Sequence, residues 1–320
     1  MRSFEIKTND ANQRVDKFLQ KSVPLLPKTL MYKYIRIKRI KVNGKRTTID
    51  QRLNEGDLVE LYINDEFFEK DEKLEFLSAP STVQIVYEDE HILLVNKKPG
   101  LVVHEDSHAT YDTLINRIKH YLYLKGEYDP QNENSFAPSL CNRIDRNTSG
   151  IVIAAKTAAA LRILNQKIKD REITKNYLCL VHGVMPKKSD TLEHYHYKNE
   201  QENKVYIYDK KTDKTKTMIT KYKVLETDGK YSLLEIELVT GRTHQIRAHM
   251  AYIGHSLVGD GKYGSNAENK DSKLKWQALC AYKLTFDFTT DAQELEYLKG
   301  RTFELCDVWF KDEFLQGRLN

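Results

Sequence analysis

The apolar residues of this chain occur in short runs, and this pattern sets the first limit on its fold. The longest runs cover residues 92–95 and 151–155, which suits buried strands and is far below the roughly 20 residues that a membrane-spanning helix needs. Residues 1–10 also lack the apolar segment of a secretory signal. Hydrophobic residues still make up 40% of the 320 residues, so we expect a water-soluble protein with one large and one small domain.

The four cysteines, Cys141, Cys179, Cys280 and Cys306, lie far apart in the sequence and lack the paired spacing of a structural zinc site. Free thiols are typical of a reducing compartment. We therefore expect a cytoplasmic protein. We also expect a monomer that does not associate with a membrane.

Basic residues are concentrated near the N-terminus. Residues 1–63 contain 14 Lys or Arg against 7 Asp or Glu, a balance of +7, whereas the whole chain carries +5, so the remainder is net negative. Between residues 28 and 46 there are eight basic residues and no acidic one. Such a segment can bind the phosphates of a nucleic acid, although a solvated basic surface is the simpler explanation for an average segment.

The apolar spacing in this part of the chain predicts a small α/β module. Apolar residues recur at helical spacing near residues 15–23 and 30–35, and Asn43-Gly44 predicts the turn of a hairpin. We assign residues 12–63 to this module. Residues 64–81 are rich in Asp, Glu and Lys and have no sustained period, so we assign them to a linker.

The order of these elements resembles the RNA-binding domain first seen in ribosomal small-subunit protein four. The matching segments are residues 14–19, 42–45 and 55–57, whereas Lys28-Thr29-Leu30 stands where that family often has Ser-Arg-Ser. The resemblance implies that basic side chains of the module contact RNA phosphates, which position the RNA without reading its sequence. We expect these contacts from Arg14, Lys17, Lys33, Arg36, Lys38, Arg39, Lys41 and Lys45.

The rest of the chain, residues 82–315, shows short strands, turns and a few helices. A strand is predicted at residues 92–95, an antiparallel hairpin is predicted from residues 218–225 and 233–239, and Thr157 is expected to cap a helix. We therefore expect an α+β domain with a mostly antiparallel mixed sheet, preceded by the small α/β RNA-binding domain.

The densest group of reactive side chains lies in residues 142–150, Asn-Arg-Ile-Asp-Arg-Asn-Thr-Ser-Gly, directly before an apolar run. Asp145 lies between Arg143 and Arg146, whose charges favour the ionised carboxylate. At the rim of a rigid strand, this carboxylate can act as a nucleophile or a base. An ion-pair network that only fixes the loop explains the segment equally well when it is considered alone.

This segment resembles the signature of the RluA-type family of RNA pseudouridine synthases, His-Arg-Leu-Asp-Arg-x-Thr-Ser-Gly, and its main departure is Asn142, where histidine is usual. Two further segments resemble the same family in the expected order. They are residues 175–183, which contain a Lys-x-Tyr strand, and residues 241–249, Gly-Arg-Thr-His-Gln-Ile-Arg-Ala-His. Motifs of this length in this order are specific. With the N-terminal module, the organisation is similar to that of RluC-like and RluD-like members.

The resemblance implies a role for each of several residues. Asp145 is the expected catalytic nucleophile, and Arg247 is expected to pair with its carboxylate. Tyr177 is expected to stack against a uracil that has left the RNA stack, and Arg143 to help hold it. We expect Arg247 to lie on a helix whose first turn is capped by Thr243.

The implied reaction cleaves the glycosidic bond of a uridine, rotates the freed base and rejoins it through C5. It is an isomerisation that calls for no cofactor and no metal, and the sequence leaves open whether Asp145 first attacks the ribose or the uracil. His194 and His196 alternate on a predicted strand, but no third ligand is evident. We therefore interpret them as surface histidines rather than as a metal site.

The expected partner is structured RNA. Family members with the additional N-terminal module mostly act on large-subunit ribosomal RNA, which is therefore the predicted target, with transfer RNA second. Two other functions are open: a non-catalytic RNA-binding factor in ribosome assembly, and a carboxylate-based hydrolase of nucleosides or glycosides. The first would be marked by the loss of Asp145 or Arg247, and the second would usually need another carboxylate in the motifs; neither feature is found.

Overall fold

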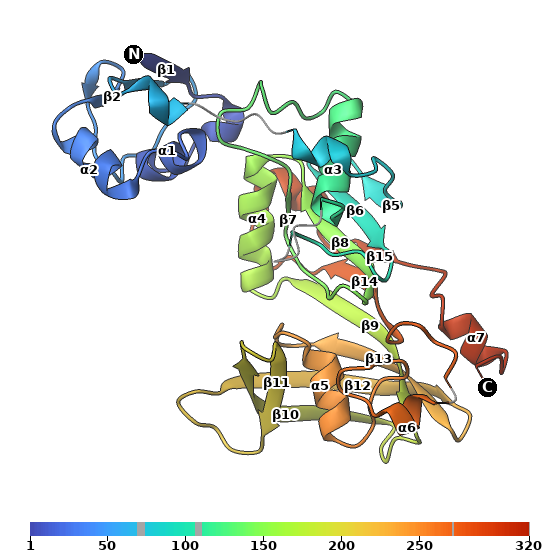
Figure 1. Cartoon of the computed structure of the whole chain (residues 1–320). Coiled ribbons are helices and arrows are strands. Elements are labelled where there is room, and N and C mark those ends of the chain that lie inside the picture. Colours follow the sequence, from blue (N-terminus) through green and yellow to red (C-terminus); the bar gives the residue numbers. More distant parts are fainter. Residues whose placement is uncertain (69–73, 106–110, 271, 320) are drawn as a thin grey trace.

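The computed structural model describes residues 1–68, 74–105, 111–270 and 272–319. These residues form two β-sheets, a four-stranded sheet near the N-terminus and an eleven-stranded sheet in the rest of the chain (Figure 1). Helices pack on both sheets, and nearly all strand pairs are antiparallel. The predicted α+β class is confirmed. None of the helices in the described ranges has the length and apolar character needed to cross a membrane.

The N-terminal sheet has the strand order β1-β4-β2-β3. Asn43 and Gly44 have φ values of 50° and 71°, and they form the predicted turn between β2 and β3. Apolar side chains of α1 and α2 pack with those of the sheet in one hydrophobic core. The elements are β1 (Arg2–Glu5), η1 (Thr8–Asp10), α1 (Val15–Ser22), α2 (Lys28–Arg36), β2 (Ile40–Val42), β3 (Lys45–Arg46), β4 (Leu58–Leu61) and η2 (Asp65–Phe68), where η denotes a 3₁₀ helix.

This N-terminal core extends beyond the limits that the sequence predicts. β1 pairs with β4, and both Ile6 and Phe68 are buried in the same core, although the predicted module covers only residues 12–63. The strand was missed because its residues are mostly exposed and show no apolar period. Part of the predicted linker, residues 69–73, lies outside the described residues.

The large sheet has the strand order β11-β10-β12-β13-β9-β14-β8-β6-β5, with β7 beside β8 and β15 beside β14. β14 pairs in parallel with β8 and antiparallel with β9, so it joins two halves of the sheet. The strands are β5 (Ile85–Glu88), β6 (Ile92–Lys97), β7 (Ser139–Leu140), β8 (Ser149–Ala155), β9 (Ile173–His182), β10 (Ser189–Asn199), β11 (Lys204–Tyr208), β12 (Lys216–Thr227), β13 (Tyr231–Leu238), β14 (Leu279–Phe286) and β15 (Thr302–Glu304).

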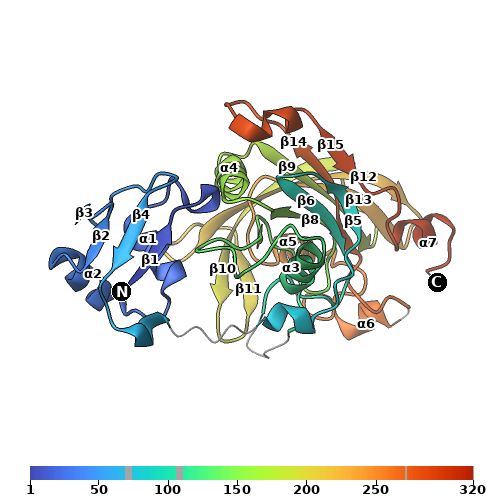
Figure 2. The ribbon, with the colours of Figure 1, turned by 90° about the horizontal axis from the view of Figure 1, so that it is seen from above.

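Helices cover both faces of this sheet (Figure 2). Along β8, Val152 and Ala154 face the core shared with α3 and α5, whereas Ile151, Ile153 and Ala155 face the core shared with α4. Both faces of β8 are therefore buried, as its uninterrupted apolar run predicts. The helices are η3 (Glu75–Ser78), α3 (Leu114–Leu124), α4 (Ala158–Lys169), α5 (Gln245–Tyr252), α6 (Asn266–Asn269), η4 (Gln293–Leu298) and α7 (Lys311–Leu315).

Local sequence signals explain several element boundaries. The Thr157 side chain accepts a hydrogen bond from the backbone N–H of Ala160 and caps α4 as predicted. β12 and β13 form the predicted hairpin. Gly150 has a φ of 116°, and a side chain there would collide with the backbone of Ala281 on β14. Only glycine therefore permits the parallel contact between β8 and β14.

Candidate active site

Asp145 lies in the loop that joins β7 to β8, and hydrogen bonds fix this loop to β8. The Asn142 side chain accepts a hydrogen bond from the backbone N–H of Ile153 at 2.8 Å, and the N–H of Cys141 donates to the Ile153 carbonyl at 2.8 Å. The N–H of Thr148 donates to the carbonyl of Asp145 at 3.1 Å and closes a turn. Asn142, at which the chain departs from the family signature, thus holds the loop without a charge.

The Arg247 guanidinium, on α5, contacts two carboxylates. Its Nη1 donates to Oδ2 of Asp145 at 3.0 Å, and its Nε and Nη2 donate to Oδ2 and Oδ1 of Asp260 at 2.7 and 2.9 Å. Burial favours a neutral Asp260, but the hydrogen bonds and charge of Arg247 outweigh it and lower the pKa of this carboxyl. The implied pairing of Arg247 with Asp145 is present, and the bidentate contact with Asp260 fixes the direction of the guanidinium.

The Asp145 carboxylate can be reached from solvent, because 27% of its side chain is exposed, against 9% for Arg247. A hollow of about 430 Å³ has Arg247 in its lining, and Asp145, Arg143 and Tyr177 are not among the described residues that line it. The hollow therefore borders the Asp145–Arg247 pair only through the arginine. The lining includes Asn147, His244, Arg247, Lys262, Trp276 and Gln277.

Tyr177 lies on β9, in register with Ile236 of β13 and Ala281 of β14. Its side chain is buried in the core below α5. Burial, together with the negative charge of Asp145, raises the pKa of Tyr177 well above its ordinary value. The phenol therefore lies within electrostatic reach of the carboxylate and keeps its proton at neutral pH.

The start of α5 differs from the prediction and brings His244 into the site. His244 precedes the helix in a left-handed conformation, with φ 51° and ψ 25°, so the predicted cap at Thr243 is wrong. The His244 Nδ1 lies 2.9 Å from the Tyr263 hydroxyl, and its Nε2 lies 4.0 Å from Oδ2 of Asp145. Burial lowers the pKa of His244, and the charge of Asp145 only partly opposes this effect. No role was predicted for His244 from the sequence.

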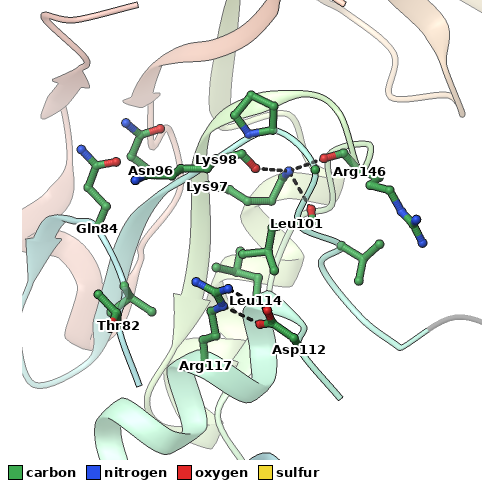
Figure 3. A pocket seen from close by; sticks show the side chains of 14 residues that line it. Thr82, Gln84, Asn96, Lys97, Lys98, Leu101, Asp112, Leu114, Arg117 and Arg146 are labelled. Carbon is green, nitrogen blue, oxygen red and sulfur yellow. Dashed lines mark hydrogen bonds and ion pairs between the residues drawn. The ribbon is translucent and has the colours of Figure 1, made fainter. Parts of the chain in front are cut away.

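Lys97 is a further residue that the sequence analysis missed. Its side chain is 1% exposed, and its Nζ donates to the carbonyl oxygens of Lys98, Leu101 and Arg146 at 2.9, 2.8 and 2.8 Å (Figure 3). Burial lowers the pKa of Lys97 to about 7, and the charge of Asp145 limits the shift. Lys97 thus ties the end of β6 to the backbone directly after Asp145.

A larger cavity of about 800 Å³ lies beside Lys97, between the end of β6 and α3. Arg117 and Asp112 line it and form a bidentate ion pair, with distances of 2.6 and 2.8 Å (Figure 3). The Nζ of Lys97 directs its hydrogen bonds to backbone oxygens rather than into the cavity. Leu114 and Arg117 of α3 and Arg146 of the loop that carries Asp145 are among the residues that line the cavity.

The two arginines beside Asp145 in the sequence do not bury its carboxylate. Arg143 and Arg146 are both exposed, and the Arg146 side chain extends away from Lys97 (Figure 3). The guanidinium that pairs with Asp145 comes instead from Arg247, about a hundred residues later in the chain. The charge pattern of residues 143–146 alone would have assigned the wrong partner.

The interpretation of His194 and His196 as surface residues is wrong for His196, which is buried, whereas His194 is half-buried. The Nδ1 of His194 lies 2.8 Å from Nε2 of His249, whose Nδ1 lies 2.8 Å from Oγ1 of Thr220. His196 is 6% exposed, and its ring nitrogens have no hydrogen-bond partner in the described part of the chain. Among those residues there is also no group of three or more His, Cys, Asp or Glu that could hold a metal ion.

The predicted RNA-contacting residues lie on the N-terminal module, which Figure 1 shows to one side of the large sheet. Most of their side chains are exposed, whereas Arg14 and Lys41 are half-buried. Arg14 forms an ion pair with Asp16 at 3.0 Å, which reduces the charge that it presents. The exposed residues of this set are Lys17, Lys33, Arg36, Lys38, Arg39 and Lys45.

Comparisons with known proteins agree with this geometry. The family described as RNA pseudouridylate synthase matches residues 91–252. An uncharacterized RNA pseudouridine synthase of Mycoplasma genitalium is 34% identical over 292 residues, which cover 88% of each chain. A ribosomal large subunit pseudouridine synthase C of Buchnera aphidicola is 33% identical over 273 residues, 82% of this chain and 80% of the relative.

A solved structure has the same fold. It is that of human RNA pseudouridylate synthase domain containing 1, with a TM-score of 0.53 and 24% sequence identity. The match covers 74% of this chain and 95% of the human chain.

Proposed function

Because the chain belongs to the RNA pseudouridylate synthase family, we propose that it isomerises selected uridines with Asp145 as the catalytic nucleophile. The chain is therefore an RNA pseudouridine synthase. The role of each residue and the RNA target are our proposal. The observation that carries the proposal is the contact of Asp145 with Arg247 at 3.0 Å, since both residues lie within the matched range. Asp260 keeps Arg247 in place, so the nucleophile is oriented before RNA arrives.

In the proposed mechanism, a uridine leaves its stack and enters the site beside Asp145. The carboxylate attacks the ribose or the uracil, the C–N glycosidic bond breaks, and the freed base rotates. A C–C bond between C1′ and C5 then forms, the covalent bond to the Asp145 carboxylate breaks and releases the aspartate unchanged, and C5 loses its proton while N1 gains one. Atoms and electrons balance within the nucleotide, so the product is an isomer of the substrate.

The surrounding residues are proposed to hold the nucleotide rather than to react with it. Arg247 neutralises the carboxylate from the protein side, and its own side chain is 9% exposed. Tyr177 offers a ring for stacking, and its protonated hydroxyl lies close enough to feel the charge of Asp145. Arg143 is exposed and is free to reach RNA phosphate or the flipped base. The hydrogen bonds of the Lys97 and Asn142 side chains to backbone groups fix the loop that carries Asp145.

We propose large-subunit ribosomal RNA as the target. The support is the name of the Buchnera aphidicola relative, a ribosomal large subunit pseudouridine synthase. We further propose that residues 12–63, together with β1, Ile6 and Phe68, which belong to the same sheet and core, form an RNA-binding domain like that of ribosomal small-subunit protein four. The proposed linker, predicted as residues 64–81, then begins after Phe68, and residues 82–315 form the proposed catalytic domain. The exposed basic side chains of α2 and the β2–β3 hairpin support this division.

We also propose that the protein is a cytoplasmic monomer. The four cysteines are free thiols, as expected in a reducing compartment.

The test is carbodiimide mapping of pseudouridines in ribosomal and transfer RNA. RNA from cells with the gene, without it, and with the Asp145→Asn variant would be compared. We expect specific pseudouridines in large-subunit ribosomal RNA to vanish in the second and third samples. Loss of sites in transfer RNA alone would contradict the proposed target, and an unchanged map without the gene would contradict the proposed activity in the cell. Full modification by Asp145→Asn would contradict the assigned nucleophile.

A further inference from the structure

The N-terminal module contacts the catalytic half of the chain through a set of polar side chains. At its centre is Asp10, which is 0% exposed. Its Oδ1 accepts a hydrogen bond from Oγ of Ser135 at 2.5 Å, and its Oδ2 accepts one from Nδ2 of Asn134 at 2.7 Å. The same Asn134 amide donates to the carbonyl of Glu5 at 2.8 Å. A carboxylate that is buried in this way would lose its main partners if the module moved away.

Asn9, the neighbour of Asp10, connects the module to a second element. Its Oδ1 accepts a hydrogen bond from the backbone N–H of Ala158, the first residue of α4, at 3.0 Å. Its Nδ2 donates to Oε1 of Glu133 at 2.9 Å. The Asn9 side chain thus connects the start of α4 to the loop before β7. Its oxygen supplies an acceptor for one of the N–H groups that a helix leaves unpaired at its start.

Both sides of this contact are rigid. On the module side, Ile6 is buried in the N-terminal core, and backbone hydrogen bonds tie residues 6–13 to residues 53–57. On the other side, the Asp129 side chain holds the turn at residues 131–132. A contact between two rigid segments fixes orientation as well as proximity.

We propose that this contact, which we call the clasp, sets the position of the basic module relative to Asp145 and so determines which uridine reaches the site. The clasp consists of Lys7, Asn9, Asp10 and Gln13 of the module, residues 132–135 and the N-terminal turn of α4. The inference rests on the proposed function, because it concerns the choice of target by that same site. It adds a specificity determinant that contacts neither the flipped uridine nor Asp145.

The position of the clasp in the chain supports this role. Residues 132–135 lead through the buried Phe136 and β7 into the loop that carries Asp145. Basic side chains on the module bind phosphates without reading sequence, so they select a uridine only if their distance from Asp145 is constant. A freely tethered module would raise the local concentration of RNA but would leave the choice of uridine to the catalytic half alone.

The experiment compares full-length variants of the clasp by small-angle X-ray scattering and by kinetics. Asp10→Asn keeps the shape of the side chain but replaces one acceptor oxygen by a donor that faces Asn134 or Ser135. Asn134→Ala combined with Ser135→Ala removes the same bonds from the other side. Thr8→Ala is the matched control, because Thr8 lies in the same 3₁₀ helix and bonds to Glu55 within the module at 2.7 Å.

Each variant would be assayed on long ribosomal RNA and on a short stem-loop that carries only the target uridine. We expect the clasp variants to become more extended in solution. On long RNA, kcat/KM should fall by about tenfold or more, and uridines near the target should become modified. Activity on the stem-loop and all properties of Thr8→Ala should stay at the wild-type level.

Three results would overturn the inference. The first is an extended wild-type protein, and the second is a set of clasp variants that open but keep the wild-type choice of uridine on long RNA. The third is an equal loss of activity on both RNAs, which would place the effect in the catalytic loop. Scattering does not depend on activity. A compact wild type without product therefore speaks against the proposed function, whereas an extended wild type with product speaks against the clasp.

Discussion

Asp260 and Asp145 use the same guanidinium in different ways. Asp260 is completely buried and takes two of the hydrogen bonds of Arg247, whereas Asp145 is partly exposed and takes one. Asp260 also accepts the backbone N–H groups of Lys262 and Tyr263 at 2.9 and 3.2 Å. The buried carboxylate therefore holds the arginine, and the exposed carboxylate remains available for the substrate.

Replacing Asp260 by asparagine should lower kcat while leaving RNA affinity nearly unchanged. The variant cannot accept both guanidinium bonds, and loss of one charge-assisted bond, about 1.5–3 kcal/mol, corresponds to roughly a ten- to hundredfold loss of rate. Single-turnover kinetics with saturating enzyme would measure it. Glu172→Gln is the control, because Glu172 is also a buried carboxylate, paired with Lys167 at 2.7 Å, and lies outside the site. An equal loss of rate in both variants would contradict a specific role for Asp260.

Lys97 gives a prediction about pH. Its pKa is lowered from 10.5 to about 7 by burial, so between these values the unfolded chain holds a proton that the folded chain has released. Stability must then rise with pH in this range. The wild type should gain up to about 1.4 kcal/mol per pH unit relative to Lys97→Met, which has no titrating group. Urea denaturation of both proteins at pH 7, 8 and 9 would show this, and parallel stability curves would contradict it.

Some of these residues could be predicted from the sequence and others could not. Asp145 and Arg247 lie in long motifs, so a resemblance identified them and implied their contact. Lys97 and Asp260 act through partners that only the fold supplies. The three acceptors of Lys97 are backbone carbonyls, which leave no trace in side-chain patterns. For Asp260, the resemblance extends from residues 241–249 to Gly259-Asp260, but it assigned no role to this carboxylate.

At the scale of elements, the contact between β8 and β14 depends on a residue without a side chain. Gly150 combines a φ of 116° with the Ala281 backbone at the place where a Cβ would lie. Residues other than glycine strongly disfavour this φ. The backbones of β8 and β14 cannot move apart without breaking hydrogen bonds to the other strands with which they pair. The loop with Asp145 enters β8 directly at this point.

Gly150→Ala should destabilise the protein by about 1–3 kcal/mol or more, because strain in φ adds to a backbone collision. The midpoint of urea denaturation would measure it. Gly229→Ala is the control, since Gly229 has a φ of 90° but open space around it, and it isolates the contribution of φ. Similar losses in both variants would show that the β14 backbone yields to the added methyl group.

Elements with a strong local signal were predicted, and those without one were not. The uninterrupted apolar run of β8, the β12–β13 hairpin and the Thr157 cap all follow from neighbouring residues. β1 was missed because its four residues show no apolar period. The start of α5 was misplaced because His244 takes a left-handed conformation, which is uncommon for residues other than glycine.

At the scale of the molecule, the basic surface of the N-terminal module predicts how RNA binding depends on salt. Lys33 and Arg36 are exposed on α2, and each phosphate contact adds about one unit to the slope of log affinity against log salt. Replacing both by alanine should therefore weaken RNA binding and reduce this slope by about two. Filter binding over a salt series would measure it.

The control for this prediction replaces two other exposed basic residues, Lys187 and Lys299, whose side chains are 65% and 51% exposed. These residues lie on the catalytic half, and the total charge changes by the same amount when both become alanine. An equal change of slope in the two double variants would show that net charge, rather than the basic surface of the module, governs binding.

The central position of β14 has a consequence for biosynthesis. Asp145 belongs to the half of the sheet with β8, whereas Tyr177 and Arg247 belong to the half with β9, and β14 is the strand between them. Its first residue, Leu279, leaves the ribosome more than a hundred residues after Asp145, a delay of several seconds at a translation rate of about 5–20 residues per second. A nascent chain can thus expose its basic module long before its catalytic centre is complete. With the proposed RNA-binding role of this module, we expect the newborn enzyme to associate with RNA before it can modify it.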